Sequence, residues 1–232
     1  ATDSAGGESG SITITGSSGI DLNGSSYTTT TSGAISFTGS VELASSGALA
    51  VQTAGGAGDD ISFSATIDDA GPATSDSALT LDGGGSSDVT VSGAAGGTSA
   101  LGSFTVANAA QVDVANIATD STAGETGSIT VSGSGIDLNG TSYTTTTAGS
   151  IGFTGPVELA SSGALSVQTA GGSGDDISFN SPIDDANPAV SDSGLNLNSG
   201  GSGNTTLNDA AGSTSRLGSF TVSSANTLTL TG

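Results

Sequence analysis

Residues 35–63 read ISFTGSVELASSGALAVQTAGGAGDDISF, and this stretch decides the fold class. Four short segments in or next to it, at 34–37, 41–43, 49–51 and 61–63, carry apolar residues at every second position. Alternation with a period of two is the pattern of a half-buried β-strand. Clusters of Gly, Ser and Asp separate the segments, and these residues favour turns. The stretch therefore predicts four very short strands joined by tight turns.

The same pattern continues along the whole chain, and no segment has the i, i+3, i+4, i+7 apolar spacing of a helix. The strands are too short, and the six Phe and two Tyr too few, for the large core of a sandwich or barrel. Short strands that each contribute one or two inward residues are typical of a parallel β-helix, in which turns stack about 4.8 Å apart. We therefore predict an all-β chain folded as a right-handed parallel β-helix, a solenoid.

A long internal repeat divides the chain into two copies, residues 1–117 and 118–232. For example, GIDLNG at 19–24 returns at 135–140, and the offset between the copies is close to 116 residues throughout. Three strands to a coil give about four coils of about 29 residues per copy. Two copies then make about eight coils, a continuous rod on the order of 40 Å long.

The alternation also predicts which side chains face the core. In the first copy these are Ile12, Ile14, Ile35, Phe37, Leu49, Val51, Ile61, Phe63, Leu79, Leu81, Phe104 and Val106. Their counterparts in the second copy should stack along the same core.

Composition excludes several classes of function. The chain has 22 acidic residues and one basic residue, Arg216, which gives a net charge of −21. Binding to nucleic acid or to anionic lipid needs clustered cations, so neither is expected. Cys and His are absent, which excludes a zinc site, a redox thiol and a histidine-based catalytic triad. No run of apolar residues is long enough to span a membrane. Because Ala100 stands where the second copy has Arg216, we expect this single cation to be incidental.

The sharpest motif is GGAGDD at residues 55–60, repeated as GGSGDD at 171–176. It matches the start of the calcium-binding nonapeptide G-G-x-G-x-D, and Ca²⁺ prefers carboxylate and backbone oxygens. We therefore regard Asp59, Asp60, Asp175 and Asp176 as candidate calcium ligands. The alternative is a Gly-rich corner whose acidic residues face water. The motif occurs once per copy, and Ser62 and Ser178 stand where the nonapeptide has an aliphatic residue, which favours the corner.

Paired carboxylates also raise the possibility of a glycosidase, which needs two carboxylates on either side of a bound sugar. The pairs are Asp59 with Asp60, Asp68 with Asp69, and their copies Asp175 with Asp176 and Asp184 with Asp185. Such enzymes usually have aromatic platforms for the sugar, and this chain has no Trp and only Tyr27 and Tyr143. We expect no catalytic residues and no required cofactor.

The segments GDDISF at 58–63 and 174–179, with IDDA at 67–70 and LGSFTV at 101–106, resemble the repeats of very large secreted bacterial proteins. The family is that of the filamentous-haemagglutinin-like, β-strand-repeat adhesins of Gram-negative bacteria, and the resemblance covers essentially the whole chain. It implies a right-handed β-helix, a location at the cell surface or outside the cell, and an adhesive or fibre-forming function. It carries over no catalytic residues.

The sequence thus favours a structural repeat segment of a long extracellular fibre or adhesin stalk. The near absence of Lys and Arg suits exposure to trypsin-like proteases. The expected partners are further copies of the same repeat, stacked end to end, together with surface glycans or a host or neighbouring cell. The alternative from another class is a calcium- or carbohydrate-binding β-helical module of a secreted protein, and a polysaccharide-degrading β-helix enzyme is a third.

Overall fold

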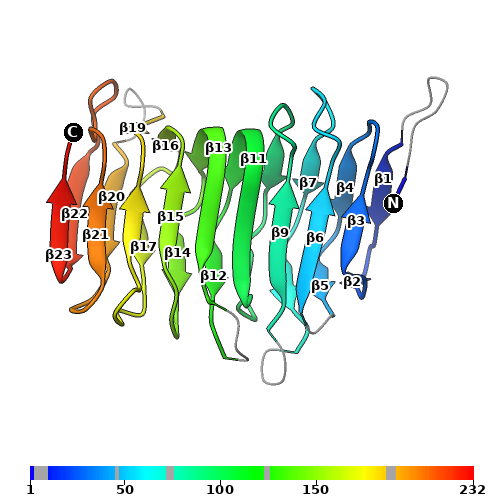
Figure 1. Cartoon of the computed structure of the whole chain (residues 1–232), viewed down its shortest axis with the longest axis horizontal. Helices are drawn as coiled ribbons and strands as arrows, with labels where there is room; N and C mark the ends of the chain where they lie inside the picture. The colour runs from blue at the N-terminus through cyan, green and yellow to red at the C-terminus, as the bar shows by residue number, and fades with distance from the viewer. Residues whose placement is uncertain (3–9, 45–46, 72–75, 123–125, 187–191) are drawn as a thin grey trace.

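The protein is a rod-shaped parallel β-solenoid of about 8 turns (Figure 1). The computed structural model describes residues 1–2, 10–44, 47–71, 76–122, 126–186 and 192–232, and these contain strands but no helix. Every strand pair is parallel, and the two termini lie at opposite ends of the rod (Figure 1). The predicted all-β parallel solenoid of about eight coils is confirmed.

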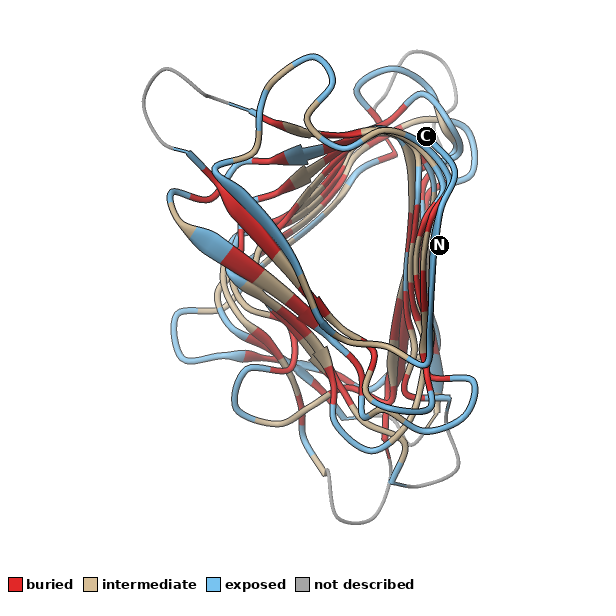
Figure 2. Ribbon diagram, turned by 90° about the vertical axis from the view of Figure 1, so that its left-hand side faces the viewer, coloured by how far each residue is buried: buried red, intermediate tan, exposed pale blue. Residues whose placement is uncertain are grey.

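Three faces enclose the core, and the section of the rod is a triangle (Figure 2). The first face stacks β1 (Ile12–Thr15), β4 (Ile35–Thr38), β7 (Ile61–Phe63), β10 (Val89–Val91), the end of β11 (Ser103–Val114), the end of β13 (Ile129–Leu138), β16 (Val157–Leu159) and β19 (Ile183–Asp185). The second stacks β2 (Ile20–Leu22), β5 (Val41–Leu43), β8 (Ile67–Asp69), β12 (Ile117–Thr119), β14 (Ser142–Thr145), β17 (Ala164–Gln168), β20 (Gly194–Asn198) and β22 (Ser219–Ser224), with a bridge through Ala95 between β8 and β12. The third stacks β3 (Ser26–Thr28), β6 (Ala48–Gln52), β9 (Ala78–Asp82), the start of β11, the start of β13, β15 (Ile151–Thr154), β18 (Ile177–Phe179), β21 (Asn204–Leu207) and β23 (Thr227–Leu230).

The turns are shorter than the 29 residues expected from the sequence. Ile12 pairs with Ile35, Ile35 with Ile61 and Ile61 with Val89, so these turns take 23, 26 and 28 residues. The corners are tight because glycine supplies conformations with positive φ. At Gly39, with φ of 122°, a Cβ atom would lie 2.1 Å from the carbonyl oxygen of Gly16 in the preceding turn.

Short turns change how the two copies are related. Each strand of the second copy lies one face away from its counterpart: β4 lies on the first face, but β15 lies on the third. Along the chain, the start of β13 comes 14 strand positions after β1, with three positions to a turn. One copy therefore spans four and two-thirds turns, and the second copy is rotated by about a third of a turn, roughly 120°, around the axis.

The predicted core is present. Ten of the twelve predicted inward residues of the first copy are at most 1% exposed, and Ile12 and Ile14 are half-buried because β1 is the first strand of its face. The counterparts in the second copy are also buried, except Phe220 and Val222 of β22 at the other end of the rod.

Aromatic rings stack inside each copy in the same way. The rings of Phe37 and Phe63, in successive turns, are 4.5 Å apart and nearly parallel, and those of Phe153 and Phe179 are 4.8 Å apart. A tyrosine ring meets the first phenylalanine of each pair edge-on. The copies therefore pack alike internally although they face different directions.

Tyr143→Phe should lower the free energy of unfolding by about 1–2 kcal/mol, because a buried hydroxyl loses its partners. The Tyr143 hydroxyl donates to the carbonyl of Val114 at 2.8 Å and accepts from the amide of Gly140 at 3.1 Å. Burial also raises the pKa of this hydroxyl. Tyr27, its counterpart, is only half-buried, so Tyr27→Phe is the matched control for denaturation by urea. Equal losses from the two variants would contradict this assignment.

Candidate functional site

The Gly-rich motif forms a corner in each copy, and its first Asp faces inward. Asp59 is only 6% exposed. One of its carboxylate oxygens accepts a hydrogen bond from the amide of Gly56 in the same corner at 2.8 Å, and the other accepts from the amide of Gly33 in the preceding turn at 2.7 Å. Asp175 repeats this arrangement with distances of 2.7 and 2.8 Å. The expected corner is present, but these two carboxylates face backbone amides rather than water.

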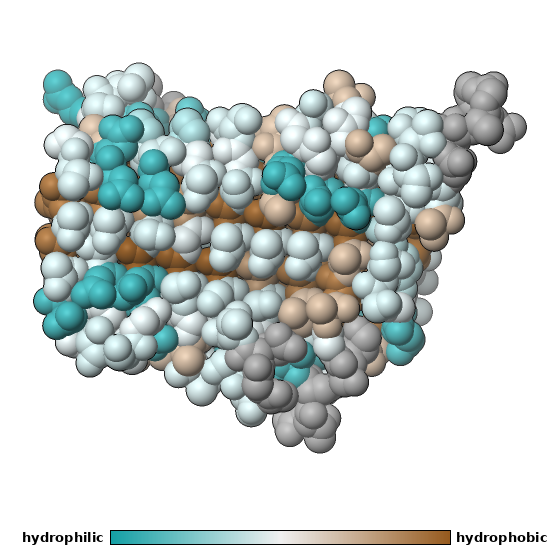
Figure 3. Space-filling model, viewed as in Figure 1, coloured by the Kyte–Doolittle hydropathy of each residue, from teal (hydrophilic) through white to brown (hydrophobic). Residues whose placement is uncertain are grey.

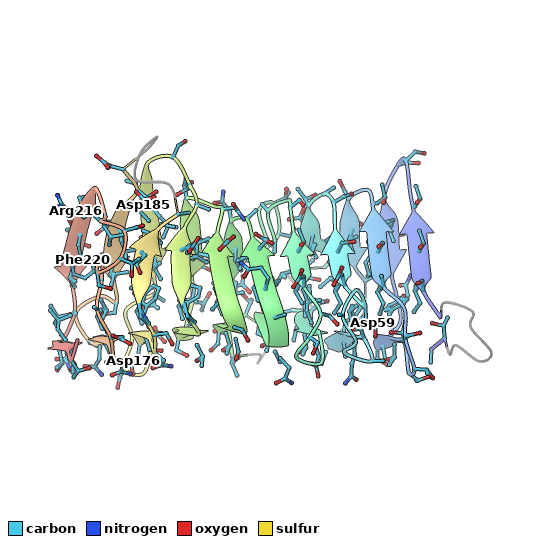
Figure 4. The ribbon with its side chains drawn as sticks, turned by 90° about the horizontal axis from the view of Figure 1, so that it is seen from above. Asp59, Asp176, Asp185, Arg216 and Phe220 are labelled. Carbon is cyan, nitrogen blue, oxygen red and sulfur yellow. The ribbon has the colours of Figure 1, made fainter. Side chains whose placement is uncertain are left out.

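The second Asp of each motif reaches in the other direction. Oδ1 of Asp60 accepts from the amide of Asp88 in the following turn at 2.9 Å. Oδ1 of Asp176 accepts from the backbone amide of Asn204 at 2.7 Å and from the side-chain amide of the same residue at 3.1 Å. Each pair of adjacent Asp residues therefore holds three successive turns together. The motifs themselves lie far apart, as Asp59 and Asp176 show at opposite parts of the rod (Figure 4).

The other acidic pairs have a similar arrangement. Oδ1 of Asp68 accepts from the amides of Thr98 and Ser99 in the following turn at 2.7 and 3.2 Å. Its neighbour Asp69 faces inward, and the Ser77 hydroxyl donates to it at 3.1 Å. In the second copy, Asp184 accepts from the amides of the corresponding loop at 2.9 and 3.0 Å. The pairs considered for glycosidase chemistry thus accept hydrogen bonds from corner amides and a corner hydroxyl.

These contacts bear directly on the calcium hypothesis. Both oxygens of Asp59 and of Asp175 already accept backbone hydrogen bonds, so a cation would have to compete with amides for the same lone pairs. Across the described ranges, no group of three or more acidic side chains is placed to hold a metal ion. Calcium binding at Asp59, Asp60, Asp175 and Asp176 stays a prediction, and titration with calcium tests it.

Arg216 lies on the surface at the C-terminal end of the rod (Figure 4). No ion pair to it occurs within the part of the chain that the structure describes. Nothing in its surroundings distinguishes this position from that of Ala100 in the first copy.

An acidic ladder runs along the first face, and the sequence analysis did not identify it. Asp113, Asp137, Glu158 and Asp184 occupy the middle of four successive strands and lie directly opposite one another. Like charges placed opposite each other on adjacent strands repel. Burial, then the charges of Asp113 and Glu158, raise the pKa of Asp137 to about 6, against a smaller lowering by a hydrogen bond from Gln111. Each strand shows one acidic residue between two apolar ones, but only the pairing register brings the four together.

The ladder borders a shallow hollow of about 360 Å³, lined by Gln111, Ser134, Gly135, Ile136, Asp137, Pro156 and Glu158. A second carboxyl with an altered titration is Asp120. Burial, then the nearby charge of Asp76, raise its pKa. Both groups add acid-sensitive positions to the junction between the copies, where Asp113 and Asp120 flank the start of the second copy.

Asp137→Asn should stabilise the protein at pH 7. A carboxyl whose pKa is about 6 in the folded state and near 4 in the unfolded state favours folding at pH values below 4, and this contribution is lost as the pH rises through 6. The neutral amide avoids that loss. We therefore expect a higher melting temperature for the variant at pH 7 and no advantage at pH 4, measured by circular dichroism.

The matched control is Asp21→Asn. Asp21 is the counterpart of Asp137, but it lies opposite one acidic residue, Glu42, and β2 is the first strand of its stack. Its substitution should change the melting temperature less at pH 7. A constant difference between Asp137→Asn and the wild type from pH 4 to pH 7 would contradict the prediction.

Comparison with protein-family models, curated proteins and solved structures finds no match to this chain. No helix in the described ranges has the length and apolar character needed to cross a membrane.

Proposed function

We propose that this chain is a non-catalytic structural repeat segment of a long extracellular fibre or adhesin stalk. The observation that carries the proposal is the junction between the copies. β11, from the first copy, pairs with β13, from the second, through eight residue pairs, with the same parallel geometry that joins turns within a copy. A repeat that joins its neighbour without a break adds length to a rod with every copy.

The acidic residues support the same function. Asp59, Asp60 and Asp68 each accept hydrogen bonds from corner amides in neighbouring turns, and their copies do likewise. Much of the acidity therefore serves the cohesion of the rod. The resemblance of the repeats to filamentous-haemagglutinin-like adhesins agrees with a secreted fibre, and so does a chain of 232 residues with a single basic residue.

The rotation between copies has a consequence for a stalk. At about 4.8 Å per turn, four and two-thirds turns advance the rod by about 22 Å per copy. Because each copy also turns by about 120°, equivalent surfaces face three directions in succession and return to the first direction at every fourth copy. A long array therefore presents the same surface all around its circumference.

Localisation and length test the proposal separately. Antibodies raised against residues 1–232 should label intact cells of the producing organism, and labelling that requires permeabilised cells would contradict an extracellular fibre. Chains with two, three and four fused copies should form rods that lengthen by about 22 Å per copy in small-angle X-ray scattering. Compact particles whose length does not follow the copy number would contradict a stalk.

A further inference from the structure

The C-terminal end of the rod exposes its core. Phe220 is 38% exposed, Leu228 44% and Leu230 58%, and these are the large apolar side chains with the greatest exposure among the described residues. They lie on β22 and β23, the last strands of their stacks, each paired on one side only. The space-filling view shows this apolar surface at the end of the rod where the chain terminates (Figure 3). A shallow hollow of about 310 Å³ lies between Phe220 and Leu230.

The molecule contains an internal copy of the same surface, already covered. The counterparts of Phe220, Leu228 and Leu230 lie on β11 and are fully buried: Phe104, Val112 and Val114. The strand that covers them is β13, the start of the second copy, which pairs with β11 directly. The difference in exposure therefore measures what the start of another copy would cover.

The N-terminal end of the rod carries that covering segment a second time. Residues 11–14 (SITI) and 20–22 (IDL) of β1 and β2 correspond to residues 128–131 (SITV) and 136–138 (IDL) of β13. β1 and β2 each have one strand neighbour, so their outer edges are unpaired. Thr2 also forms the bridge to Thr29 that the second copy forms between its equivalent residues. Unpaired strand edges of this kind are templates for pairing with another chain.

We propose that the C-terminal end of one molecule binds the N-terminal end of a second copy of this chain, in the register of the internal junction. Internally, Phe104 lies opposite Ile129, Val112 opposite Ile136 and Val114 opposite Leu138. Transferred to the ends, the register places Phe220 opposite Ile12, Leu228 opposite Ile20 and Leu230 opposite Leu22. This inference rests on the proposed function, because it names the partner and the contact by which separate rods join.

Charge favours the transferred contact over the internal one. At the internal junction Asp113 lies opposite Asp137, and the two carboxylates repel. The counterpart of Asp113 in the second copy is Thr229, which would lie opposite Asp21 of the next molecule. The contact between molecules thus keeps the apolar residues of the internal junction and lacks its pair of like charges.

The test is the association of residues 1–232 over a wide range of concentrations, followed by sedimentation velocity and small-angle X-ray scattering. We expect end-to-end oligomers whose length is a multiple of the single rod. Phe220→Asp should abolish them. Thr229→Lys should tighten association about two- to fivefold by pairing with Asp21, and Thr229→Asp should weaken it by a similar factor. Thr80→Lys, on the same face but in β9, adds the same charge away from both ends and is the control.

Each contrary result overturns a distinct statement. A monomer at every concentration would overturn the proposed contact. Association that is indifferent to the charge at position 229 would overturn the register, and weakening by Thr229→Lys would indicate that C-terminal ends pair with each other. Fused copies that lengthen the rod while separate chains stay monomeric would reject this contact and leave the structural function standing.

Discussion

Asp175→Ala should lower the free energy of unfolding by about 3–5 kcal/mol, in the presence of a calcium chelator as well as in its absence. The carboxylate is 5% exposed and accepts hydrogen bonds from the amides of Gly149 and Gly172. Hydrogen bonds to a charged acceptor are strong, and their removal leaves two corner amides without partners. The same loss is expected for Asp59→Ala in the first copy, because the geometry repeats. Urea denaturation followed by circular dichroism measures both.

The adjacent residue provides the control. Asp176→Ala removes a carboxylate that is partly exposed, so water can replace it at the amide of Asn204, and we expect a loss of about 1 kcal/mol. If the motif instead binds calcium, millimolar calcium should raise the melting temperature of the wild type, and both substitutions should remove that increase. Such a result would replace the structural role of the corner with a metal site.

The sequence predicts the strands and the core well because alternation is a local property. Whether Ile35 and Phe37 face inward depends only on the two-residue period of their own strand. The same argument applies to Ile151 and Phe153, and all four are buried. A repeated sequence then gives a repeated core.

The relation between the copies is not local, and the sequence analysis did not predict it. The number of residues in a turn depends on the corners, and turns of 23, 26 and 28 residues occur within one copy. Because these lengths add up to four and two-thirds turns rather than about four, the same strand appears on a different face in each copy. The acidic ladder depends on this register too, since Asp113 and Asp137 belong to different copies.

The spacing of the Gly-rich motif located a real corner, but the role of its carboxylate depended on a distant residue. Gly33 precedes Asp59 by 26 residues and comes next to it only when the turns stack. Within the motif, the sequence could suggest the contact between Asp59 and Gly56, because an Asp that bonds an amide three residues away is a common turn. The contact between turns requires the solenoid register.

Phe179→Ala should lower the free energy of unfolding by about 3–5 kcal/mol, because it removes a buried ring from a core that has no other large side chain to fill the space. Phe179 is 1% exposed, stacks on Phe153 and lies opposite Leu207 in the next turn. In a solenoid each turn is stabilised by its two neighbours, so the loss should concentrate in the turns around β18. Hydrogen exchange should show faster exchange at the amides of β15, β18 and β21, and little change in β4 and β7.

Phe220→Ala is the control for this substitution, because it removes the same ring from β22 at the open end of the rod. That ring is 38% exposed and packs on one side only, so at concentrations where the chain is monomeric we expect a loss of less than about 1 kcal/mol. Phe63→Ala, in the first copy, should match Phe179→Ala in size, since its ring stacks on Phe37 in the same way. It should move the loss of protection to the turns around β7. If Phe179→Ala instead speeds exchange equally along the whole rod, the solenoid unfolds as one cooperative unit, and the stability of each turn is not set by its neighbours alone.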